Sequence, residues 1–76
     1  MHPSAILRRG DALLRAGAYA GAVAEHEQAA DVFLDGGFTI KAVAVLRQAA
    51  DIIDQSAPQL VGARTRILRA LQSYFM

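Results

Sequence analysis

Residues 17–34 read GAYAGAVAEHEQAADVFL, and residues 37–54 read GFTIKAVAVLRQAADIID. Each stretch opens with glycine near an aromatic residue, and each continues with a row of residues at steps of four, three and four. The rows are Ala22, His26, Ala29 and Phe33, then Ala42, Leu46, Ala49 and Ile53. Residues at these steps share one face of a helix, so small and large side chains alternate along that face. The pattern predicts paired helices that pack closely through alanine.

The rest of the chain extends this pattern to an all-α domain over residues 1–76. The expected helices cover about residues 4–16, 20–35, 39–54 and 58–75. Short connections make consecutive helices antiparallel, as a helical array or bundle. Ser4, Thr39 and Ser56 are expected as helix caps, and Pro58 as the first residue of the last helix. Gly10 falls inside a helix, which predicts a neighbouring helix that presses close to it.

Composition limits the class of protein. The chain is 54% hydrophobic and 20% charged, has a net charge of +1 and contains no cysteine. The absence of cysteine excludes disulfides and cysteine-based zinc sites, and a reducing cytoplasm fits it. No apolar run reaches the length needed to span a bilayer, so we expect no membrane insertion and a cytoplasmic location. The apolar excess fits either closely packed alanines or a surface meant for a partner or a second copy.

Charge is unevenly distributed along the chain. Residues 1–20 and 59–76 are basic, whereas residues 21–58 are acidic. Glu27, Asp31 and Asp35 form an acidic stripe at steps of four, and such like charges repel mildly in an isolated helix. We therefore expect a basic side chain near the stripe. The candidates are Arg8, Arg15, Arg66 and Arg69.

The segment from Leu13 to Ala29 resembles a tetratricopeptide repeat. A helix, a glycine-aromatic turn and a second helix with alternating alanine and bulky residues follow one another, as in that family. The matching positions are Gly10, Leu13, Gly17, Tyr19, Ala22, His26 and Ala29, then Ala30, Phe33, Gly37, Ala42, Leu46 and Ala49. The two units are offset by 20 residues, against roughly 34 in a regular array. The resemblance implies a helical array that binds other proteins.

Residues able to carry chemistry are few. His26 lies on an apolar row, and the neighbouring glutamates point to other sides of the helix, so packing is the expected role and a metal site is not. No catalytic serine, phosphate-loop or dinucleotide motif is present. We expect no enzyme, no cofactor and no metal. Arg64, Arg66 and Arg69 would give few phosphate contacts, so nucleic acid is not the expected partner.

The last helix is the expected docking surface, because it ends in large apolar residues where repeat arrays usually carry a polar capping helix. Ile67, Leu71, Tyr74 and Phe75 are the predicted interface anchors. The predicted rim charges are Glu27, Asp31, Asp35, Arg66 and Arg69. The resulting hypothesis is a non-catalytic interaction module, either an adaptor, a scaffold or an assembly subunit. A self-assembling structural subunit is the first alternative, and a weak nucleic-acid-binding protein is the second.

Overall fold

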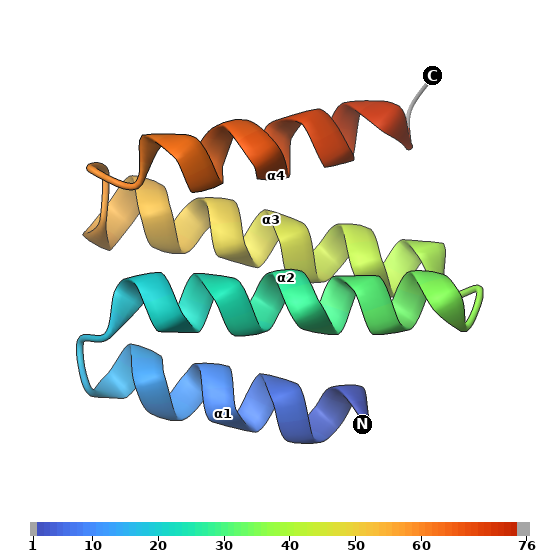
Figure 1. The fold of residues 1–76 in the computed structure, drawn as a ribbon, viewed down its shortest axis with the longest axis horizontal. Helices are drawn as coiled ribbons and strands as arrows, with labels where there is room; N and C mark the ends of the chain where they lie inside the picture. Colours follow the sequence, from blue (N-terminus) through green and yellow to red (C-terminus); the bar gives the residue numbers. More distant parts are fainter. Residues whose placement is uncertain (1, 75–76) are drawn as a thin grey trace.

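A computed structural model describes residues 2–74, which fold into four α-helices. They are α1 (Pro3–Arg15), α2 (Tyr19–Asp35), α3 (Thr39–Ser56) and α4 (Val61–Ser73). The chain reverses direction at each connection, so that consecutive helices lie antiparallel and side by side (Figure 1). The all-α, four-helix prediction is therefore confirmed for the described residues.

The helices form a thin array in which each one packs mainly on its neighbours in sequence. The Cα atoms extend over 31 × 26 × 14 Å, and the shortest dimension is the thickness of the array. The radius of gyration, 11.6 Å, is close to the value of about 11 Å that a compact chain of this length has. Helices α2 and α3 each lie between two others, whereas α1 and α4 form the edges (Figure 1).

Alanine allows the helices to approach closely, as the repeated rows predict. Ala22, Ala29, Ala42 and Ala49 are fully buried. Of the large members of these rows, His26, Leu46 and Ile53 are buried and Phe33 is partly buried. The core is completed by Ile6, Val23, Ala30, Val45, Ala57 and Ile67. Val45 lies outside the predicted row and is nevertheless buried.

Gly10 marks the closest approach of α1 to α2. A Cβ atom at this position would lie 3.1 Å from two atoms of the His26 ring and 3.3 Å from the Cβ atom of Glu25. The neighbouring helix that Gly10 predicts is therefore α2, and the His26 ring is the part of α2 that lies against Gly10.

Two connections of the same kind separate the first three helices. Gly17 and Gly37 have φ angles of 77° and 82°, in the left-handed region that glycine adopts at little cost. After α1, the Ala18 amide donates to the Leu13 carbonyl and the Gly17 amide to the Leu14 carbonyl. After α2, Phe38 and Gly37 make the same pair of bonds to Phe33 and Leu34. This is the Schellman arrangement, which satisfies the last carbonyls of a helix.

Three predicted caps are wrong. The side chain that caps α1 belongs to His2, whose Nδ1 accepts a hydrogen bond from the Ser4 amide at 3.1 Å. Thr39 is the first residue of α3 and follows the capping position at Phe38, which makes no side-chain cap bond. Ser56 ends α3 and begins no helix. In α2 and α3 the residue that closes the preceding turn also occupies the N-cap, which leaves no place for a hydroxyl cap.

Helix α4 begins at Val61, three residues after the predicted start at Pro58. A proline disfavours helical geometry in the residue before it, and Ala57 leaves the helix with φ −144°. Pro58 then takes the second position of a tight turn, where its fixed φ is also favoured, and the Leu60 amide donates to the Ala57 carbonyl at 3.0 Å. Ala57 is fully buried, so this turn is anchored in the core.

Candidate interaction surface

Three of the predicted anchors, Ile67, Leu71 and Tyr74, lie on the inner side of the last helix. Ile67 is only 1% exposed, and Leu71 and Tyr74 are partly buried against the core. Ile67 is therefore a core residue in this structure and is unavailable as an exposed anchor, which corrects its predicted place on the surface. Phe75 lies outside the described residues. The apolar row that the sequence shows most clearly is thus the one that α4 uses to pack on α3.

The opposite side of α4 carries a second row, Val61, Thr65, Leu68 and Gln72, which we call the outer face. Val61 is 66% exposed and Leu68 is 37% exposed. The Thr65 hydroxyl donates to the Val61 carbonyl at 3.0 Å, so its hydrogen bond is made within the helix. The four positions follow the same steps of four, three and four as the buried rows of α2 and α3. This spacing could have indicated the outer face from the sequence. Two of its four residues are polar, so the row does not stand out as an apolar face.

Two arginines of α4 pair with acids of other helices. Arg66 donates through Nε and Nη2 to the two carboxylate oxygens of Glu27, each at 3.3 Å. The expected basic neighbour of the acidic stripe is therefore Arg66. Arg64 Nε donates to Asp54 Oδ1 at 2.7 Å, and this bond lowers the pKa of the Asp54 carboxyl and raises the pKa of Arg64. The third, Arg69, is exposed and makes no ion pair with residues 2–74.

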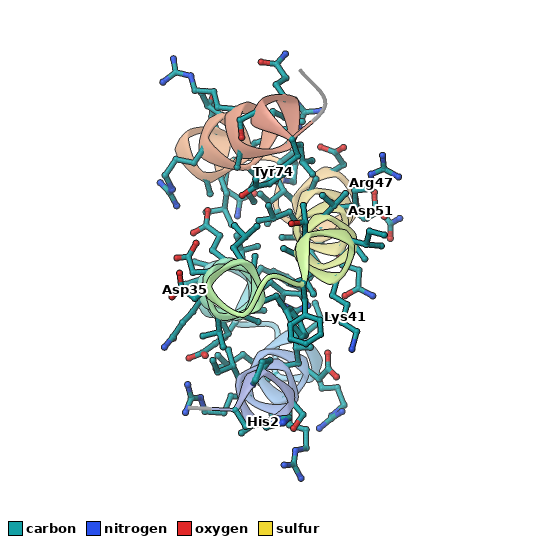
Figure 2. All side chains as sticks on the ribbon, turned by 90° about the vertical axis from the view of Figure 1, so that its right-hand side faces the viewer. His2, Asp35, Lys41, Arg47, Asp51 and Tyr74 are labelled. Carbon is teal, nitrogen blue, oxygen red and sulfur yellow. The ribbon has the colours of Figure 1, made fainter. Side chains whose placement is uncertain are left out.

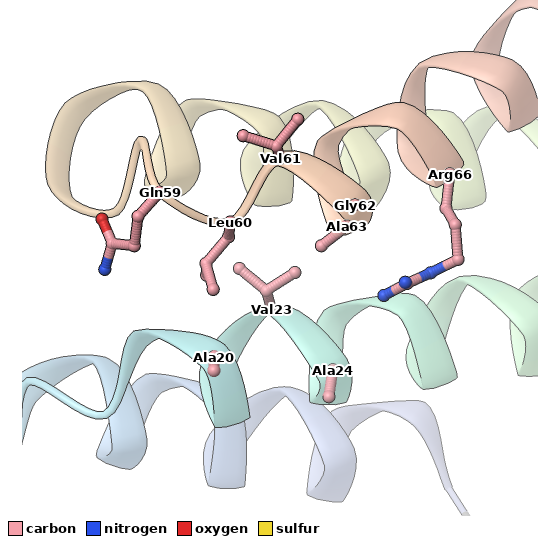
Figure 3. Close-up of a pocket in the computed structure, with 9 residues that line it drawn as sticks. All are labelled: Ala20, Val23, Ala24, Gln59, Leu60, Val61, Gly62, Ala63 and Arg66. Atoms are coloured by element: carbon pink, nitrogen blue, oxygen red, sulfur yellow. The ribbon is translucent and has the colours of Figure 1, made fainter.

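A shallow groove runs between α2 and α4 on one broad side of the array. Its first part, of about 360 Å³, is lined by Ala20, Val23, Ala24, Gln59, Leu60, Val61, Gly62, Ala63 and Arg66 (Figure 3). Its second part, of about 230 Å³, is lined by Glu27, Asp31, Leu46, Ile67, Ala70 and Tyr74. Arg66 borders both parts and reaches toward α2, so the Arg66–Glu27 pair crosses the groove at the middle. Asp35, the last residue of the stripe, is exposed at the end of α2.

A second apolar surface, the Ile40 patch, consists of Phe38, Ile40 and Val43. Ile40 is 86% exposed and Phe38 is 53% exposed, and Tyr74 of α4 borders a hollow beside Ile40 and Val43. Phe38 also packs edge-on against Phe33, with ring centroids 6.4 Å apart, and the Lys41 ammonium lies 5.1 Å from the Phe38 ring. Figure 2 views this end of the array, where Lys41 and Tyr74 are labelled. No pattern in the sequence indicated this surface.

His26 serves the packing of α1 on α2. Its ring is buried, and Nδ1 donates to the Ala22 carbonyl, 2.7 Å away, because a carbonyl can only accept. Within residues 2–74, no group of three histidine or acidic side chains is placed to hold a metal ion. No helix in the same part of the chain has the length and apolarity to cross a membrane.

Comparison with protein-family models, curated proteins and solved structures gives no significant match. The surfaces described above are therefore the basis on which a function is proposed.

Proposed function

We propose that this chain is a non-catalytic protein–protein interaction module, built as a short tetratricopeptide-like array, that docks another protein. The observation that carries the proposal is the exposure of Ile40, Val61 and Phe38 in a domain whose other large apolar side chains are mostly packed. Burying one such side chain gains about 1.5–3 kcal/mol, so a partner that covers several of them binds favourably. An adaptor, a scaffold or an assembly subunit would use such surfaces.

The tetratricopeptide-like part of the proposal is supported by local structure. The helices follow one another in sequence order, they meet through fully buried alanines, and a glycine turn of the same geometry follows both α1 and α2.

Charged residues would form the rim of such a contact. Asp31, Asp35 and Arg69 are exposed near the apolar surfaces, and the Glu27–Arg66 pair lies across the groove. Rim charges of this kind orient a partner and speed its approach, and they add little to affinity. Of the three arginines of α4, Arg64 and Arg66 already bind acids, which weakens the case for a phosphate contact by this helix.

Self-assembly is the second candidate, and the Ile40 patch favours it. This patch lies at one end of the array and holds the two large apolar side chains Ile40 and Phe38 close together. A copy of the chain that covered it would bury both at once. Sedimentation of the purified protein separates the candidates. A monomer at all concentrations supports a foreign partner, whereas a discrete oligomer that Ile40→Ser dissociates supports self-assembly.

The main test is affinity capture from the native host with two matched variants. One variant carries Phe38→Ser, Ile40→Ser and Val61→Ser. The control carries Gln28→Ser, Gln48→Ser and Gln55→Ser, which are equally exposed polar positions. We expect a protein that the wild type and the control retain in stoichiometric amount and the apolar variant loses, with equal helicity by circular dichroism. If all three chains retain the same proteins, the proposal fails.

A further inference from the structure

We propose that the outer face of α4 binds an acidic amphipathic helix of the partner protein. This inference rests on the proposed function and names the class of structure that the partner presents.

The outer face of α4 has the row of side chains that one helix uses to pack on another. Val61, Thr65, Leu68 and Gln72 lie in one row along α4, at the steps by which the buried rows of α2 and α3 meet their neighbours. Two exposed apolar side chains, Val61 and Leu68, lie along it, with the Thr65 methyl group between them. A helix that packs on such a row lies with its axis about 8–10 Å away, and it contacts the row with residues three and four apart.

The charge around the row selects the partner. Helix α4 contains three arginines and no acidic residue from Val61 to Ser73. Arg64 and Arg69 lie on either side of the row, about 70° from its centre line by helical geometry. Both are exposed; Arg64 is already bonded to Asp54, whereas Arg69 makes no ion pair with the described residues. Glutamates or aspartates that flank an apolar row on a partner helix would face these two guanidinium groups.

Pairing of the outer face with the same face of a second copy is disfavoured by these charges. In an antiparallel two-fold pair centred on the row, Val61 faces Gln72 and Thr65 faces Leu68 of the other copy. The two-fold axis keeps each flank of the row on its own side, so Arg64 lies on the same flank as Arg64 of the other copy, and Arg69 on the same flank as Arg69. Like charges that meet across an interface cost free energy, and neither leucine finds an apolar partner directly opposite.

Stacking of α4 on α1 of another copy is disfavoured for a similar reason. The outer side of α1 is polar, with Ser4, Arg8, Asp11 and Arg15 exposed. Arg64 and Arg69 would then meet a side that carries two arginines and one aspartate. The two edges of the array are therefore both basic, and an acidic helix from a different protein complements α4 better than either edge of this chain.

The test uses the full chain and two synthetic helical peptides, by fluorescence anisotropy. The acidic peptide carries leucines at steps of four, three and four with glutamates on both flanks, and the basic peptide carries lysines in place of the glutamates. We expect the acidic peptide to bind about tenfold more tightly or better at low ionic strength. The difference should shrink as salt screens the exposed charges.

Variants locate the contact. Leu68→Ser should weaken the acidic peptide about tenfold, as loss of a central apolar anchor does. Arg69→Glu should reduce the preference for the acidic peptide, and it changes an exposed position that the fold does not need. Ile40→Ser, which removes a more exposed apolar side chain from the other surface, should change neither affinity. Circular dichroism of each variant verifies the fold.

The inference would be overturned by equal affinity for both peptides, by equal effects of Leu68→Ser and Ile40→Ser, or by self-association of the wild type that Leu68→Ser abolishes. The last result would mean that a second copy covers α4. If neither peptide binds while capture from the host still depends on Phe38 and Ile40, this inference fails and the proposed function stands. If capture depends on no apolar side chain, both fail.

Discussion

The contact between Gly10 and His26 shows how a single residue sets the distance between two helices. The His26 ring is buried and held by its hydrogen bond to Ala22, so it cannot swing away from α1. The Glu25 Cβ atom belongs to the fixed part of its side chain and closes the other side. A methyl group at this position would therefore push its neighbours aside by a few tenths of an ångström. The sequence predicts both the close approach and the packing role of His26, because each lies on a helical face.

Gly10→Ala should destabilise the fold, whereas Gly62→Ala should stabilise it. At Gly10 the new methyl group meets His26 and Glu25, and overpacking of about 1–3 kcal/mol outweighs the gain in helix propensity, about 1 kcal/mol. At Gly62 a Cβ atom meets nothing within 4 Å, so the propensity gain, at most about 1 kcal/mol, remains. Urea unfolding of both variants measures the two signs. A Gly10→Ala variant as stable as Gly62→Ala would contradict the close approach of α1 and α2.

At the scale of elements, the joint between α3 and α4 combines a turn with an ion pair. The Ala57–Leu60 turn reverses the chain, and the Arg64–Asp54 bond ties the first turns of α4 to the end of α3. Both charged side chains are about half exposed, so solvent screens the pair and its contribution is small.

The joint should make stability depend on pH through Asp54. The hydrogen bond from Arg64 lowers the folded-state pKa of Asp54 below the unfolded value of about 3.9. The stabilisation is therefore complete above the unfolded pKa and is lost as pH falls through the folded pKa. Between about pH 5 and pH 2, the wild type should lose slightly more stability than Asp54→Asn. Denaturant titrations at several pH values measure the free energy of unfolding of both chains. If it depends on pH in the same way for the wild type and Asp54→Asn, the Arg64 bond does not favour the ionised Asp54 carboxylate.

The turns show where the local sequence is enough to predict the end of a helix and where it is not. The glycines of the first two connections predict where α1 and α2 end, because no other residue adopts their positive φ as readily. Pro58 is ambiguous, since its fixed φ suits the first turn of a helix and the second position of a tight turn equally well. Ala57 is fully buried in the structure, and the local sequence does not indicate that burial.

The faces of α4 were ambiguous for the same reason. The sequence identifies an apolar row on this helix and does not state whether the row meets the core or a partner. Ile67, Leu71 and Tyr74 face the core because α3 offers a large apolar surface there. The pairing of Arg66 with Glu27 was among the expected contacts, because a stripe of three acids requires a basic neighbour. The exposure of Ile40 was not expected, because an apolar residue in a helix is normally assigned to the core.

At the scale of the whole molecule, the thin array gives its helices unequal support. Helix α2 is covered by α1 and α3, whereas α4 packs less extensively on α3 and reaches α2 through the Arg66–Glu27 pair. Exposed ion pairs add little stability, so α4 is the most weakly held helix of the array.

Amide hydrogen exchange should follow this order. Local opening costs least where few apolar contacts are lost, so α4 amides should exchange faster than those at the centres of α2 and α3. Helix α1 is the internal control, because it is also an edge helix but packs on α2 more extensively. NMR gives the amide exchange rates of each helix, at a pH where local opening of the helices is reversible, and these rates are compared between the helices. Equal protection of α1 and α4 would contradict the weaker hold on α4.

The sequence-neighbour packing of the four helices also bears on how the chain reaches its structure. Each hairpin forms from residues that are close along the chain, so little loop entropy is lost before its contacts form. Chains dominated by such local contacts fold in microseconds to milliseconds. The α1–α2 and α2–α3 hairpins share α2 and the same kind of turn, so either can form first and template the other. Because synthesis runs from the N-terminus, the α1–α2 hairpin is the first that a newly made chain can form.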